Sequence, residues 1–165
     1  MDSLINFKEI KNGTLRIDNF YFLLIIFFIF ILDRYTKIEI INNFSNNKFF
    51  VNNYINFDLV WNTGIGFGLF HSSSVLIYNI ISIFIASVII FLIYLIITSE
   101  KFEKISFSII VGGALGNFYD RIVFKAVPDF IDLHYSTFHW FTFNVADIFI
   151  TVGIIGFLIN GSLKK

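Results

Sequence analysis

The stretch Val75–Ile97 constrains the fold more than any other part of the chain, because it holds 23 consecutive residues without a charged side chain. A membrane core of about 30 Å is crossed by about 20 apolar helical residues, so this stretch predicts a transmembrane helix. Of all 165 residues, 56% are hydrophobic and only 15% are charged. This composition is typical of integral membrane proteins and not of soluble domains.

Three other apolar segments predict three more helices. The predicted transmembrane helices cover about residues 18–38, 75–97, 105–124 and 141–160. The first contains the short apolar run Phe20–Leu32, which by itself would also fit the core of a signal peptide. It continues into Asp33-Arg34-Tyr35-Thr36-Lys37 instead of a small-residue cleavage site, so we expect one helix that reaches spanning length. Residues 1–165 are therefore predicted to form a single integral membrane domain.

The segments 39–74 and 125–140 are predicted to lie outside the membrane. In Tyr54–Asn62, apolar and polar residues mostly alternate, which predicts a half-buried strand. The glycines and aromatic residues of 64–70 favour a short segment lying on the membrane surface. A hairpin is expected between residues 133–135 and 138–141.

The basic residues predict the orientation in the membrane. With the N-terminus inside, the cytoplasmic segments hold seven of the 12 basic residues: Lys8, Lys11, Arg16, Lys101, Lys104, Lys164 and Lys165. The positive-inside rule therefore favours a cytoplasmic N-terminus and a cytoplasmic C-terminus.

This orientation places the unusual polar residues at the outer face. They are Asp33, Lys37, Asn62, Asn117, Asp120, Arg121, Asp129, Asn144 and Asp147. Ionisable groups at membrane depth are costly and usually functional. Helical spacing places Asn117, Asp120 and Arg121 on one face, where Arg121 can pair with a carboxylate. For Asp33–Lys37 and Asp120–Arg121, a role as polar links between helices is the alternative interpretation.

Asp129 and Asp147 have no cation at helical spacing, and both are expected at the edge of the apolar layer. Two carboxyl groups that share such a site cannot both ionise, so one keeps a proton near neutral pH. An ionised and a protonated carboxyl group together can activate water and polarise a peptide carbonyl. The pair therefore indicates aspartyl proteolysis.

Other chemistries lack the necessary residues. The three histidines do not have H-E-x-x-H spacing, no G-x-S-x-G motif occurs, and the chain contains no cysteine. The net charge of zero, without a basic block, argues against nucleic-acid binding. A proton-coupled transporter or channel subunit remains the alternative function. Against it, the glycine-rich polar motif occurs once, whereas transporters commonly contain repeats.

The chain resembles the lipoprotein signal peptidases (signal peptidase II), a family of small bacterial membrane aspartyl proteases. The resemblance extends from about Asp33 to Ile159 and rests on five fragments in order. They are Asp33-x-x-x-Lys37, Asn62-Thr63-Gly64 with Phe67, Gly112-Gly113-x-x-Gly116-Asn117-x-x-Asp120-Arg121, Asp129-Phe130-Ile131-Asp132 and Phe143-Asn144-x-Ala146-Asp147.

The resemblance implies an all-α membrane protein with four transmembrane helices, a small extracytoplasmic β-cradle and a short surface helix. It implies that signal peptides are removed from prolipoproteins before a diacylglyceryl-modified cysteine, near the outer face of the bacterial cell membrane. Asp129 and Asp147 would be the catalytic pair. The residues that would line or support the substrate site are Asp33, Lys37, Asn62, Gly113, Asn117, Asp120, Arg121, Asn144 and Ala146. Prolipoproteins and membrane lipids are the expected partners of a monomer that needs no metal or organic cofactor.

Overall fold

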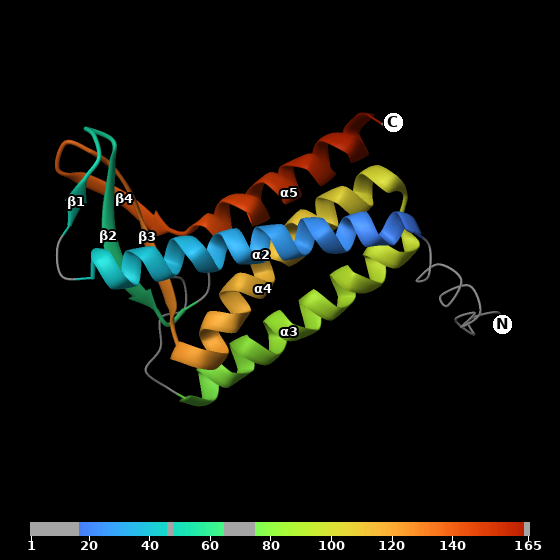
Figure 1. The fold of residues 1–165 in the computed structure, drawn as a ribbon, viewed down its shortest axis with the longest axis horizontal. Coiled ribbons are helices and arrows are strands. Elements are labelled where there is room, and N and C mark those ends of the chain that lie inside the picture. Colours follow the sequence, from blue (N-terminus) through green and yellow to red (C-terminus); the bar gives the residue numbers. More distant parts are fainter. Residues whose placement is uncertain (1–16, 46–47, 65–74, 164–165) are drawn as a thin grey trace.

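Four long helices form a bundle with a small β-sheet at one end (Figure 1). The computed structural model describes residues 17–45, 48–64 and 75–163. Within these ranges the helices are α2 (Ile17–Asn43), α3 (Val75–Thr98), α4 (Lys101–Phe124) and α5 (Val145–Leu163). The C-terminal ends of α2 and α4 and the N-terminal ends of α3 and α5 lie beside the sheet.

Helix α4 is the centre of the bundle and packs against each of the other three helices. Small residues allow this close approach: a Cβ atom added to Gly112 would lie 2.8 Å from the Cβ of Ile29 on α2. Gly112 and Gly116 form a G-x-x-x-G pair, a pattern that permits close helix packing. Apolar side chains of α2, α3 and α4 form the core of the bundle: Phe22, Ile89, Ile96, Phe107 and Val111.

The sheet contains four antiparallel strands in the order β1-β2-β3-β4. Their bounds are β1 (Phe49–Phe50), β2 (Ile55–Asn62), β3 (Val127–Tyr135) and β4 (Phe138–Phe143). The strand predicted from alternation is therefore confirmed as β2. The expected hairpin is present but longer, because β3 pairs with β2 as well as with β4. The short strand β1 was not predicted.

Several predicted helix ends need correction. Helix α5 begins at residue 145 and not at 141, because residues 138–143 complete β4. Helix α4 begins four residues before the predicted position, where Glu100 and Glu103 form a reciprocal capping box. Helix α2 continues to residue 43 instead of ending near 38. The predicted surface helix falls mostly on residues 65–74, which lie outside the described residues.

Among the described residues, two helical stretches are long and apolar enough to cross a membrane, Tyr78–Thr98 and Val145–Leu163. Helices α2 and α4 have sufficient length, but their sequences include several charged residues toward both ends. Apolar side chains also cover the outer surface of the bundle, among them Ile83, Phe84 and Ile90 on α3. The architecture is thus mostly helical with one small sheet, and the outward apolar surface suits lipid.

Candidate active site

The N-terminus of α5 fixes the position of Asp147. Asn144 immediately precedes the helix, and its side-chain oxygen accepts a hydrogen bond of 3.1 Å from the backbone N–H of Asp147. The carboxylate of Asp147 in turn accepts a bond of 3.2 Å from the backbone N–H of Asn144. This reciprocal arrangement is a capping box, so Asp147 lies in the first helical turn. The predicted helix bounds of 141–160 placed Asp147 deeper in the helix, and this is wrong because α5 starts at residue 145.

Asp129 reaches the same place from β3. Helix α4 ends at Phe124, and its C-cap residue Lys125, with a left-handed backbone (φ 58°), turns the chain into the strand. The carboxylate of Asp129 then accepts two side-chain amide hydrogen bonds, 2.6 Å from Asn144 and 2.8 Å from Asn62. Its side chain is almost entirely buried. Strand β2 therefore contributes Asn62, and the cap of α5 contributes the second donor.

The surroundings of Asp129 favour its protonated form. Burial, and then the negative charge of Asp147, raise the pKa of the Asp129 carboxyl group to about 6. The hydrogen bonds from Asn62 and Asn144 act in the opposite direction, because they favour the charged form. The net effect leaves Asp129 able to hold or release a proton close to neutral pH.

Asn117 on α4 connects Asp147 to a buried lysine. Its amide nitrogen donates to the Asp147 carboxylate at 2.8 Å, and its amide oxygen accepts from Lys37 Nζ at 2.8 Å. Lys37 also donates to Asp33 at 2.8 Å and to Asp120 at 2.7 Å. Lys37, Asp33 and Asp120 have no solvent exposure. Two donors of the ammonium group thus hold α2 against α4, through Asn117 and Asp120, while the third bonds to Asp33 within α2.

Asp33 also links α2 to α5. Its second carboxylate oxygen accepts a hydrogen bond of 3.0 Å from the backbone N–H of Ala146. Gly113 lets α4 approach α5 at the same residue, because an added Cβ would lie 2.5 Å from the carbonyl oxygen of Ala146. At Gly116 an added Cβ would collide with the carboxylate of Asp33. These positions need glycine because three helices meet at the site.

Asp120 forms its ion pairs with Arg34 and Lys37 on α2, and not with its neighbour Arg121. Arg121 instead donates to the backbone carbonyl groups of Asn117 at 3.1 Å and Gly64 at 2.9 Å. It therefore ties α4 to the segment after β2. Arg34 was missed as a site residue, although an arginine in an apolar helix is itself a sign of a buried polar contact.

The structure brings the residues expected from the sequence into one region. Hydrogen bonds connect ten of them: Asp129, Asp147, Asp33, Lys37, Asn62, Asn117, Asp120, Arg121, Asn144 and Ala146. Gly113 lies against Ala146. Besides Arg34, sequence reasoning missed Tyr78, whose hydroxyl donates to the Arg121 carbonyl group at 2.8 Å. A tyrosine within an apolar helix has no sequence feature that marks it as a site residue, so the sequence alone could not have identified Tyr78.

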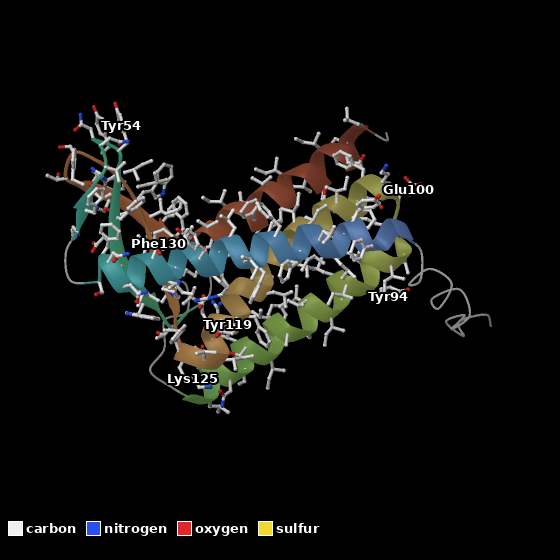
Figure 2. The ribbon with its side chains drawn as sticks, in the orientation of Figure 1. Tyr54, Tyr94, Glu100, Tyr119, Lys125 and Phe130 are labelled. Carbon is white, nitrogen blue, oxygen red and sulfur yellow. The ribbon has the colours of Figure 1, made fainter. Side chains whose placement is uncertain are left out.

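A groove of about 260 Å³ leads to Asp147, which is half-buried. Its lining is mostly apolar and comes from β3, β4 and α5: Leu133, Phe141, Phe143, Asp147, Ile148, Thr151 and Val152. A larger cavity, of about 600 Å³, lies at the opposite end of the bundle near Glu100, which is labelled in Figure 2. We place the candidate site at the smaller groove, because its lining includes Asp147, which Asn144 joins to Asp129.

Comparisons with known proteins identify the family. A model of the signal peptidase (SPase) II family matches residues 25–163. The lipoprotein signal peptidase of Pelagibacter ubique (strain HTCC1062) is 47% identical over 86% of this chain and 88% of its own. The lipoprotein signal peptidase of Clostridium novyi (strain NT) is 41% identical over 80% of this chain and 90% of its own.

A solved structure, described as a bacterial membrane enzyme determined by the in meso method at 2.3 Å resolution, has the same fold. Its TM-score is 0.71 and its sequence is 32% identical, over 87% of this chain and 88% of the other. A second such structure, at 1.9 Å resolution, has a TM-score of 0.68 and 31% identity over 85% and 91%. With a family model that covers most of the sequence and relatives of this similarity, the chain belongs to the signal peptidase II family.

Proposed function

We propose that this chain is an aspartyl endopeptidase that removes signal peptides from bacterial prolipoproteins, with Asp129 and Asp147 as its catalytic pair. One observation carries the assignment of the pair: Asn144 bonds to the Asp129 carboxylate and, through the capping box, holds Asp147. Membership of the signal peptidase II family agrees with this activity. It gives no support to a transporter or channel subunit.

In the proposed mechanism the two carboxyl groups share one proton. The ionised carboxylate takes a proton from a water molecule, whose oxygen attacks the carbonyl carbon of the scissile peptide bond. The protonated carboxyl group donates its proton to the carbonyl oxygen, which produces a neutral tetrahedral diol. The diol then collapses. The carboxyl group that took the proton from water gives it to the leaving amine nitrogen, the other carboxylate takes a proton from a diol hydroxyl, and the carbon–nitrogen bond breaks. Because the two groups titrate as a coupled pair, the roles of acid and base belong to the pair.

The remaining site residues would position this pair. Asn117 and Asn144 would orient the carboxylates, while Lys37, Asp33 and Asp120 would hold α2 against α4 and, through Ala146, against α5. Arg121 would brace the chain next to the substrate site, since it bonds the carbonyl group of Gly64. Gly113 and Ala146 allow α4 and α5 to approach closely enough for these contacts.

The apolar groove beside Asp147 would receive the substrate from the membrane side. A diacylglyceryl group on the cysteine after the scissile bond anchors a substrate by about 0.8 kcal/mol for each buried CH₂ group. Such an anchor would hold the scissile bond at the membrane surface and leave little need for side-chain pockets. This supports cleavage directly before a lipid-modified cysteine.

We further propose that all four helices cross the membrane as one domain, with both termini in the cytoplasm and the protein working as a monomer. Three charged residues of α2, Asp33, Arg34 and Lys37, are buried, and Arg34 and Lys37 pair with Asp120 on α4, so these three need not face lipid. The sheet and the site then lie together at the extracytoplasmic end, where lipid headgroups would surround them. Accessibility of single introduced cysteines at residues 101 and 136 to a membrane-impermeant thiol reagent would test this orientation.

The function is tested by comparing two forms of one prolipoprotein precursor, with and without the diacylglyceryl group on its cysteine. The purified protein in detergent should cleave the modified form and leave the unmodified form largely intact, as a mobility shift in a gel would report. Equal cleavage of both forms would contradict the proposed specificity. Cleavage of neither form would contradict the proposed activity.

A further inference from the structure

The hairpin of β3 and β4 brings three metal-binding side chains to one face of the sheet. Asp132 and His134 are two residues apart on β3, and His134 Nδ1 lies 4.0 Å from the Asp132 carboxylate, so their side chains share one face. His139 on β4 is the direct cross-strand partner of His134. A shift in register between Asp132 and His134 marks an irregularity in the hairpin at this point. We call Asp132, His134 and His139 the hairpin triad.

The side chains of the triad lie close together. His139 Nδ1 is 2.7 Å and 3.0 Å from the two carboxylate oxygens of Asp132, and His134 Nδ1 is 4.0 Å from the nearer one. The two imidazole rings stack with their centroids 5.4 Å apart. One ligand atom from each residue can be chosen so that all three lie within 4.8 Å of one another.

Two buried polar atoms beside the triad have no hydrogen-bond partner within the part of the chain that the structure describes. The first is Nδ1 of His134, whose side chain is only 8% exposed. The second is the side-chain oxygen of Asn56, the residue of β2 paired with Asp132. A buried polar atom without a partner costs about 1–3 kcal/mol, so the atom within the triad and the one on the paired strand both need an explanation.

We propose that the hairpin triad binds a divalent transition-metal ion, with zinc as the best match. Two imidazole nitrogens and one carboxylate oxygen form an established ligand set for zinc, which prefers about four ligands at about 2.0–2.2 Å. Small side-chain rotations would bring the three ligand atoms to these distances. The ion would satisfy His134 Nδ1 and leave a position for water or the Asn56 oxygen. His139, which is half exposed, provides the route of entry.

The metal site is distinct from the proposed catalytic pair. Tyr54 lies at the outer end of the sheet in Figure 2, and its ring stacks on that of Tyr135 at the hairpin end, 6.0 Å between centroids. The triad therefore occupies the outer half of the hairpin, while Asp129 lies at its inner end, where Asn144 binds it. A bound ion would link β3 to β4. Because β3 also carries Asp129, the ion would stabilise the strand that positions this carboxyl group.

Zinc binding is measured on the full chain purified in detergent, treated with a chelator and carrying no polyhistidine tag. Zinc chloride alone should bind at one ion per chain in isothermal titration calorimetry. At about a hundred times the dissociation constant, it should raise Tm by about 5–10 °C. His139→Ala removes one exposed ligand and should abolish both effects. The matched control is Asp58→Asn, which removes a partly exposed carboxylate of the same sheet and should retain both.

A second readout separates metal binding from a loss of folding. Cobalt chloride added to the wild-type protein should produce visible absorption bands of a nitrogen- and oxygen-ligated ion. Both His134→Gln and His139→Ala should lose these bands while their far-ultraviolet circular dichroism stays unchanged. The proposal is overturned if the wild-type protein binds neither ion. It is equally overturned if His139→Ala binds zinc and cobalt as the wild type does.

Discussion

The side-chain amide of Asn144 donates a hydrogen bond of 2.6 Å to the carboxylate of Asp129. One partner is the residue that caps α5, and the other belongs to β3. The same asparagine accepts from the backbone of Asp147, so a single side chain sets the relative positions of both carboxyl groups. The geometry of the proposed catalytic pair therefore depends on how the sheet is joined to the last helix.

Removal of the Asn62 hydrogen bond should change the pH dependence of cleavage. The pKa of Asp129 is raised to about 6, so the pair loses its shared proton above that pH and kcat/KM should fall. Asn62 donates to the ionised form and thereby lowers this pKa. Asn62→Leu should raise the pKa further and shift the alkaline limb of the kcat/KM profile to higher pH. The exposed Asn43→Ala on α2 is the control and should leave the limb in place. A limb that stays or moves to lower pH in Asn62→Leu would contradict the explanation.

Lys37→Met should strongly destabilise the protein. Lys37 is fully buried and contacts Asp33, Asn117 and Asp120, so its removal takes away the cation paired with buried Asp33 and leaves Asp120 with Arg34 alone. Breaking a buried ion pair in this way costs about 3–5 kcal/mol. Lys48→Met provides the matched control, because Lys48 is largely exposed in its pair with Asp58, and such pairs contribute about 1 kcal/mol or less. Thermal unfolding in detergent measures both, and similar losses of Tm would refute the assigned role of Lys37.

Gly113→Ala should reduce both stability and cleavage. The added methyl group would lie 2.5 Å from the Ala146 carbonyl oxygen and 3.0 Å from Ile150, which forces α5 and its Asp147 away from α4. Overpacking of this kind costs about 1–3 kcal/mol. The control is Gly161→Ala, the same substitution in α5 at a position where nothing lies within 4 Å of the added Cβ. It should stabilise the helix by up to about 1 kcal/mol. Equal cleavage by the two variants would argue against close packing at Gly113.

Local patterns predicted most of the elements. The apolar runs predicted the four helices, and the alternation in residues 54–62 predicted β2. The errors lie where tertiary contacts decide an element's end. Phe141 and Phe143 are apolar and were therefore predicted to begin the last helix. They belong instead to β4, which pairs with β3, so α5 begins later. Strand β1 has only two residues and is defined by its pairing with β2, which leaves no periodic signal.

The candidate site was more predictable than the exact contacts within it. Helical spacing correctly predicted the contact between Asp33 and Lys37, because the helix itself places residues four apart next to each other. The partner of Asp120 was not predictable in this way, since Arg34 is on another helix and only the packing of α2 against α4 brings it close. The same holds for the bridge that Asn144 makes to Asp129, which needs β3 in its folded position.

The central claim is that Asp129 and Asp147 together perform the cleavage. The most direct test measures single-turnover cleavage of a diacylglyceryl-modified prolipoprotein by Asp129→Asn, Asp147→Asn and the control Asp58→Asn, all shown to be folded. We expect each variant of the pair to lose activity by about 100-fold or more, as for removal of a general acid or base, while the control stays near the wild-type rate. Asp132→Asn should lose far less than either. Full cleavage by Asp129→Asn or by Asp147→Asn would contradict the claim.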